Sequence, residues 1–167
     1  MESISKIQFI KDFGNIFEDS KWIAAEVYKK KPFKNFNDIK KNMIICFKKS
    51  SKKKKLKVLI KHPDLADKTK IAKLTSYSKK EQKDSNLNQC TPNEYYRFKE
   101  LNKKYKNKFG FPFIMAVSGK KKYQILSSFE KRVMLKKKSE FEEATNQVIK
   151  IATLRLKSLE NKYNNIV

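Results

Sequence analysis

Apolar residues recur at helical spacing from the start of this 167-residue chain. Ile7, Ile10, Phe13 and Phe17 follow one another in steps of three, three and four, which predicts an amphipathic first helix with these residues on its inner face. Ser20 is a residue type that commonly precedes a helix, so we expect a second helix to begin after it. The pattern therefore predicts helical structure from the beginning.

A third helix is expected to begin at Asn37 or Asp38, because both residue types cap helix starts. A later helix must stop at Pro63, since proline lacks a backbone N–H and disfavours helical geometry in the residue before it. His62 is therefore expected at a helix end, with its ring projecting from a fixed backbone.

Three later helices are predicted from capping boxes, in which Ser or Thr is followed three residues on by Glu. The second of these boxes also has Pro92 at the first helical position, where proline is well tolerated. The predicted starts and their partners are Ser78 with Glu81, Thr91 with Glu94, and Ser139 with Glu142.

The longest nearly uncharged apolar run extends from Phe109 to Val117 and contains Pro112, which would break a helix. We therefore expect a buried extended segment near residues 111–118 between two helices. Its backbone N–H and C=O groups need partners, and those not paired with protein can bind a ligand. A core-crossing connection without function remains the alternative. With no alternation typical of strands, the chain is predicted to be all-α, a single irregular bundle of about seven or eight helices over residues 1–167.

The net charge of +24 raises nucleic acid or an anionic membrane as partners. However, lysine supplies nearly all of it and is spread along the chain, which equally fits a solvated surface. Arginine, which phosphate and base recognition favour, occurs only at Arg97, Arg132 and Arg155. No stretch approaches the length of a membrane span. Neither end of the sequence carries a secretory or peroxisomal signal, so a cytoplasmic location is expected.

Metal chemistry is not expected, because Cys46 and Cys90 lie far apart and the chain has one histidine. That histidine, His62, is the only imidazole available for acid–base chemistry. The alternative is a purely structural role, in which His62 caps a helix or fills the core. Ser78, Glu81 and Gln82 put three polar groups near a predicted helix start, where a capping role and anion binding are both open.

The last helix carries an arginine on an apolar face. Ala144, Val148, Ile151, Arg155 and Leu159 follow at steps of four, three, four and four. A guanidinium facing a core must be paired or meet an anion, because an unpaired buried charge is very costly. Arg155 is therefore expected either to pair with a structural carboxylate, to reach solvent at the edge of the stripe, or to bind an anionic ligand.

These pieces together resemble the 2-oxo-4-hydroxy-4-carboxy-5-ureidoimidazoline (OHCU) decarboxylase family. The resemblance runs from about residue 56 to 159, and the pairing of an HPDLA motif with KFGFPF at this spacing is specific. The motifs are His62-Pro63-Asp64-Leu65-Ala66, Ser78-x-x-Glu81-Gln82, Lys108-Phe109-Gly110-Phe111-Pro112-Phe113 and Lys150-Ile151-Ala152-x-Leu154-Arg155. One departure is Ser85-Asn86-Leu87, where the family commonly has Ala-Gly-Leu. Asn is the next best residue to Gly in a left-handed conformation, so the backbone is expected to be preserved.

The resemblance implies an all-α, cofactor-free carboxy-lyase of urate degradation that forms (S)-allantoin from a small anionic ureido-imidazoline, without nucleic acid or membrane partners, and that is a homodimer. It implies catalytic roles for His62, Glu81 and Arg155. It implies substrate binding by Pro63, Ser78, Gln82, Ile114, Met115, Ala116, Val117 and Ser118. The competing hypothesis is a lysine-rich helical nucleic-acid-binding protein without catalysis, which explains the charge but leaves the motifs as accidents.

Overall fold

The structure is a computed structural model that describes residues 4–164. Residues 1–3 and 165–167, parts of the terminal sequences used for the expected location, lie outside it. Within the described residues every regular element is a helix, so the all-α prediction is confirmed. The chain divides into two compact units, one of residues 1–61 with 149–167 and one of residues 62–148.

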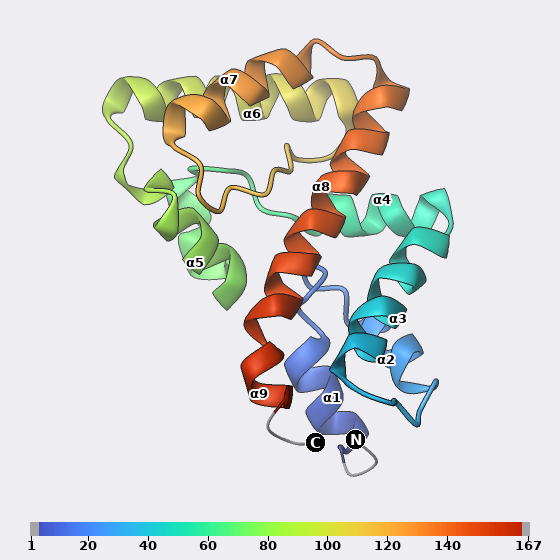
Figure 1. The fold of residues 1–167 in the computed structure, drawn as a ribbon. Coiled ribbons are helices and arrows are strands. Elements are labelled where there is room, and N and C mark those ends of the chain that lie inside the picture. The colour runs from blue at the N-terminus through green and yellow to red at the C-terminus, as the bar shows by residue number, and fades with distance from the viewer. Residues whose placement is uncertain (1–3, 165–167) are drawn as a thin grey trace. The chain divides into compact units, whose positions relative to one another are not determined.

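The first unit contains helices from both ends of the sequence, and α1, α2 and α3 are consecutive neighbours in it (Figure 1). An aromatic core fills this unit, in which Phe17 lies 4.9 Å from Phe47 and Phe36 stacks 5.5 Å from Tyr163, centroid to centroid. The helices are α1 (Lys6–Phe13), α2 (Lys21–Tyr28), α3 (Phe36–Lys49), α4 (Lys52–Lys61), the last turns of α8 (Lys137–Ser158) and α9 (Glu160–Asn164).

The first helix is shorter and turned differently from the prediction. It ends at Phe13, and its buried residues are Phe9 and Phe13, four apart on one face. Ile7 is 83% exposed, so its expected inward position is wrong. Phe17 is buried, but from the connection after the helix. The third helix also begins earlier than expected, because Asn35 caps it by accepting a hydrogen bond from the backbone N–H of Asp38 at 3.0 Å.

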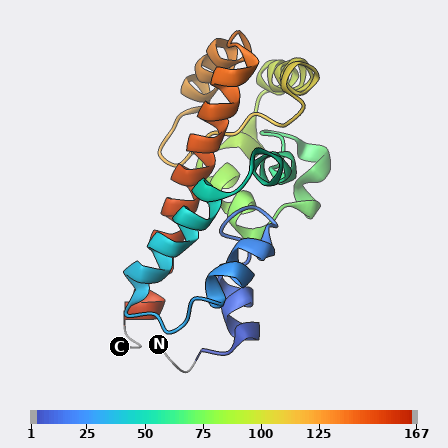
Figure 2. The ribbon, with the colours of Figure 1, turned by 90° about the vertical axis from the view of Figure 1, so that its right-hand side faces the viewer.

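In the second unit, α6 and α7 pack together (Figure 1). Between them the chain runs without helix through residues 111–118, as expected, and Figure 2 shows this segment as a bare trace. The segment follows Gly110, the residue that ends α6 in a left-handed conformation with a φ of 79°. The elements are η1 (Lys68–Lys73), α5 (Ser76–Asp84), η2 (Leu87–Gln89), α6 (Pro92–Phe109), α7 (Lys122–Val133) and the first turns of α8.

Two of the three predicted capping boxes are wrong, and one is confirmed. Helix α5 begins at Ser76 because Thr75 accepts the backbone N–H of Ser78, so Ser78 lies inside the helix. Thr75 stands three residues ahead of Ser78 and can cap equally well, while Ser78 is buried against the core. Ser139 likewise lies inside α8, which begins at Lys137. The box of Thr91 with Glu94 opens α6 as predicted.

The extended segment is packed by aromatic rings from both neighbouring helices. Phe113 stacks on Phe129 at 3.9 Å between centroids, and Tyr105 meets both rings edge-on. All three side chains are fully buried. The apolar residues of the segment therefore anchor it within the unit.

Asn86 stands where the family commonly has glycine, and its backbone keeps the expected left-handed conformation with a φ of 56°.

Replacing the confirmed cap should weaken the second unit. Thr91→Ala removes the acceptor for the Glu94 N–H, and we expect a loss of about 1 kcal/mol of unfolding free energy. Thr153→Ala is the matched control, because Thr153 is exposed inside α8 and its hydroxyl bonds a carbonyl that the helix already uses. Urea denaturation measures both variants, and equal losses would contradict the capping role.

Candidate functional site

His62 directly follows α4 and begins a non-helical loop of residues 62–66, as the proline at position 63 predicts. Its side chain is buried, with 7% exposure. Ala66, at the other end of the loop, has a φ of 57°, which is uncommon for a residue with a side chain. The loop must therefore be held by contacts from outside it.

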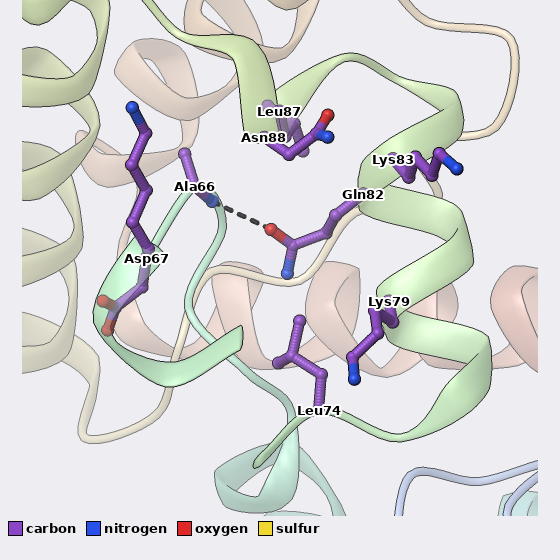
Figure 3. A pocket seen from close by; sticks show the side chains of 9 residues that line it. Ala66, Asp67, Leu74, Lys79, Gln82, Lys83, Leu87 and Asn88 are labelled. Carbon is purple, nitrogen blue, oxygen red and sulfur yellow. Dashed lines mark hydrogen bonds between the residues drawn. The ribbon is translucent and has the colours of Figure 1, made fainter. Parts of the chain in front are cut away.

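Gln82 on α5 supplies two of these contacts. Its Oε1 accepts the backbone N–H of Ala66 at 3.0 Å (Figure 3). Its Nε2 donates to the backbone carbonyl of Asp64 at 3.3 Å. Asn102 of α6 adds a third by donating to the carbonyl of Leu65 at 2.9 Å. Gln82 was predicted from the resemblance as a substrate ligand. The structure places it as a clamp on the loop that carries His62.

Ser78, Glu81 and Gln82 lie along one side of α5, as positions three and four apart on a helix do. Ser78 is 3% and Gln82 is 8% exposed, whereas Glu81 is half-buried. Thr75, and not Ser78, is the N-cap, so the Ser78 hydroxyl does not cap the helix. The second unit thus contains His62, Pro63, these three polar residues and segment 114–118.

The backbone of segment 114–118 is held by side chains from three directions. The carbonyl of Ile114 accepts from Arg132 Nη1 at 2.7 Å, and the N–H of Ala116 donates to Gln147 Oε1 at 3.0 Å. The carbonyl of Val117 accepts from Ser85 Oγ at 2.8 Å. Ile114 and Val117 are buried, Met115 and Ala116 are half-buried, and Ser118 is exposed.

A buried ion pair behind this segment escaped the sequence analysis. Arg132 bonds both carboxylate oxygens of Glu140, which is fully buried, and its guanidinium lies 4.5 Å from the centre of the Phe113 ring. Tyr105 donates its hydroxyl to the same carboxylate. Burial and the Glu140 carboxylate raise the pKa of Tyr105 far above its usual range, so the hydroxyl remains a donor. Glu140 stands four residues before Ala144, so extending the apolar stripe backward would have found it.

Arg155 belongs to the first unit, and its inward orientation is confirmed by a side-chain exposure of 2%. It forms an ion pair with Glu18 at 2.9 Å and donates to the carbonyl of Asn15 at 3.1 Å. Pairing with a structural carboxylate was one of the alternatives for this arginine. Glu18 itself is 3% exposed, and no periodicity in the sequence singled it out.

A cavity of about 160 Å³ opens beside Gln82 in the second unit (Figure 3). Among the predicted site residues that the structure describes, Gln82 is the one that lines it. Its walls combine apolar side chains with lysines and other polar side chains. They are formed by Ala66, Asp67, Lys68, Leu74, Lys79, Gln82, Lys83, Leu87 and Asn88. The predicted catalytic Glu81 does not line this cavity.

Fold and candidate site together define a helical protein with one imidazole, a polar helix face and an anchored extended segment. Within the described residues no cluster of metal-ligating groups occurs, and no helix has the length and apolar character needed to span a membrane. The chain also matches the family model described as OHCU decarboxylase over residues 2–157. It therefore belongs to the OHCU decarboxylase family.

Individual relatives support this family membership. The chain is 34% identical over 159 residues to the 2-oxo-4-hydroxy-4-carboxy-5-ureidoimidazoline decarboxylase of Halalkalicoccus jeotgali, covering 95% of this chain and 89% of that protein. It is 35% identical over 159 residues to the uric acid degradation bifunctional protein of Bacillus sp. strain TB-90, spanning 95% of this chain but 31% of that longer protein.

Among solved structures, the crystal structure of (S)-allantoin synthase is similar, with a TM-score of 0.73 and 31% identity over 93% of this chain and 51% of that one. The function predicted from the sequence, a carboxy-lyase of urate degradation leading to (S)-allantoin, is confirmed by this membership. The competing hypothesis of a nucleic-acid-binding protein is not supported by these relatives.

Breaking the ion pair of Arg155 should strongly destabilise the first unit. Glu18→Gln removes the carboxylate that forms an ion pair with the buried Arg155 guanidinium, so we expect a loss of about 3–5 kcal/mol of unfolding free energy. Glu26→Gln is the control, because Glu26 pairs with Lys29 at the surface and such pairs contribute about 0–1 kcal/mol. Chemical denaturation compares them. A Glu18→Gln loss no larger than the control's would show that the pair is not structural.

Proposed function

We propose that His62 handles the proton in the decarboxylation of OHCU to (S)-allantoin by this chain. The observation that carries this role is the placement of the only histidine in a loop that three side-chain hydrogen bonds immobilise. A proton handler must be held in one geometry, and histidine titrates nearest to neutral pH. The proposal also treats residues 1–167 as one catalytic domain, since the family model covers residues 2–157.

The substrate is an anionic ring with a hydroxyl and a carboxylate on one carbon. When the bond to the carboxylate breaks, CO₂ leaves and its electron pair stays on the ring carbon. The adjacent C=N bond of the ureido-bearing ring carbon accepts that pair, which leaves an enolate whose oxygen is the former hydroxyl, so the reaction needs no added electron sink. That oxygen becomes the ring carbonyl when the ureido-bearing carbon takes the proton. The protein must hold the carboxylate out of the ring plane, stabilise the enolate and deliver a proton to one face. Delivery to one face gives a single enantiomer.

We assign His62 to the substrate hydroxyl or carboxylate, with Pro63 and Ser78 beside the ligand. Glu81 and Gln82 bind the ring and ureido N–H groups. The two loop contacts of Gln82 use one of its N–H groups and one lone pair of its oxygen, and an amide has a second of each. Gln82 can therefore clamp the loop and still contact a ligand. The segment from Ile114 to Ser118 contributes backbone groups.

Arg155 enters the proposal on the resemblance, as a group that stabilises charge on the substrate's carbonyl side. A tight salt bridge to the departing carboxylate would stabilise the ground state and oppose the reaction. Its pair with Glu18 is compatible with this role, because a guanidinium has five N–H donors in a fixed fork. A ligand-bound structure with Arg155 gripping the leaving carboxylate would contradict this assignment.

Assembly and location are also proposals. A homodimer follows from the resemblance. A reducing, cytoplasmic setting fits two free cysteines whose thiols are kept protonated, since burial raises the pKa of both Cys46 and Cys90. The lysine-rich surface is assigned to solvation and to attraction of the anionic substrate, without a nucleic-acid or membrane partner.

His62→Gln should lower kcat by on the order of 10²–10⁴, the usual contribution of a positioned proton-transfer group. Glutamine keeps hydrogen-bonding capacity and similar size but does not titrate. The measurement is the rate of OHCU consumption under saturating substrate. Lys57→Gln serves as the control, because Lys57 is an exposed neighbour on α4 and should leave kcat unchanged. A His62→Gln enzyme within tenfold of wild type would remove His62 from this role.

A further inference from the structure

Segment 114–118 was assigned to substrate binding as a whole, but its anchors distinguish one amide from another. We infer that Arg132, Gln147 and Ser85 are positioning residues that turn the N–H groups of Met115 and Ser118 toward the substrate, while the N–H of Ala116 serves as an anchor. This inference rests on the proposed function and names which backbone groups of that site act. Each anchor comes from a different place in the second unit: α7, α8 and the end of α5.

In a trans peptide, the C=O of one residue and the N–H of the next point in opposite directions. Arg132 holds the C=O of Ile114 at 2.7 Å. The N–H of Met115 belongs to that same peptide group and therefore points away from Arg132. The peptide is trans, since the one cis bond among the described residues is elsewhere.

The same reasoning applies at the other end of the segment. Ser85 Oγ donates to the C=O of Val117 at 2.8 Å, and the backbone N–H of Lys120 donates to the same oxygen at 2.9 Å. With that carbonyl fixed twice, the N–H of Ser118 points away from Ser85. Within the part of the chain that the structure describes, neither the Met115 nor the Ser118 N–H has a protein acceptor.

Ala116 differs from both, because its N–H is already bonded to Gln147 Oε1 at 3.0 Å. Gln147 is 9% exposed, and its Nε2 donates to Glu143 Oε1 at 2.6 Å one turn earlier on α8. The glutamate thus fixes which end of the Gln147 amide faces Ala116. An acceptor held in this way keeps the middle of the segment in one orientation.

Arg132 is the strongest of the three anchors. It bonds Glu140 and the Ile114 carbonyl and stacks on Phe113, all inside the unit. Lysine could not reproduce these contacts, because they use the planar fork of a guanidinium. This explains why an arginine stands here in a chain where lysine supplies nearly all the positive charge. Its removal would leave a buried Glu140 unpaired, so Arg132 is unsuitable for a clean test.

Gln147 and Ser85 provide the test. Gln147→Met removes the acceptor for Ala116, and Ser85→Ala removes the donor to Val117. We expect each to lower kcat/KM by roughly tenfold to a hundredfold through misplaced amides, with kcat falling as well. The double exchange Glu143→Gln with Gln147→Glu keeps a donor at 143 and an acceptor at 147. It should restore most of the activity lost in Gln147→Met, because the hydrogen bond to Ala116 is restored.

NMR signals and hydrogen exchange of the backbone amides test the same inference without a measurement of turnover. Addition of (S)-allantoin to the wild-type protein should shift the Met115 and Ser118 amide signals, while the Ala116 amide stays protected from exchange with and without ligand. In Gln147→Met that protection should be lost. Ser85→Ala keeps the kinetic test available if Gln147→Met does not fold.

Several results would overturn the inference. One is free exchange of the Ala116 amide in the wild type, and another is a ligand-induced shift confined to the Ala116 amide. A third is retention of wild-type kcat and KM by both Gln147→Met and Ser85→Ala. Failure of the proposed function looks different, because the wild-type protein itself would then fail to consume OHCU. Exchange at Ala116 would still report on the anchor in that case.

Discussion

Buried backbone outside a helix has to find hydrogen-bond partners, and the second unit of this chain is organised by that requirement. Two non-helical stretches, residues 62–66 and 111–118, occur among its helices. Neither can bond to a sheet, so side chains from surrounding helices hold both. Gln82 and Asn102 hold the first stretch, while Arg132, Gln147 and Ser85 hold the second. Every proposed site residue of this unit lies in these stretches or on the helix beside them.

Charge in this protein separates into two populations. The lysines cover the surface, and exposed ion pairs such as Lys29 with Glu26 and Lys80 with Asp84 contribute little. Two of the three arginines are buried, each with a buried carboxylate: Arg132 with Glu140 and Arg155 with Glu18. The net charge of +24 therefore says little about the interior. The two buried arginines mark the places where a fixed, multidentate cation is needed.

The sequence predicted those features that depend on local chemistry. Proline placed His62 at a helix end, Pro112 predicted the extended segment, and the step of four from Ile151 predicted an inward Arg155. Helix starts were predicted less well. Thr75 and Ser78 are both able to cap, and the burial of Ser78 decides between them.

Several polar partners could not be predicted, because they come from distant parts of the chain. Glu18 is 137 positions from Arg155, and Ser85 is 32 positions from Val117. A motif shows which residues are present but not which of them hold the others in place. Gln82 illustrates the difference, since the resemblance assigned it to the substrate while the structure also gives it the His62 loop.

The central claim is that this chain delivers a proton to one face of a decarboxylated ring. The most direct measurement generates OHCU in solution from urate with urate oxidase and the following hydrolase, and records circular dichroism with and without this protein. The account predicts rapid appearance of optically active (S)-allantoin when the protein is present. Slow formation of racemic allantoin in both samples would contradict it.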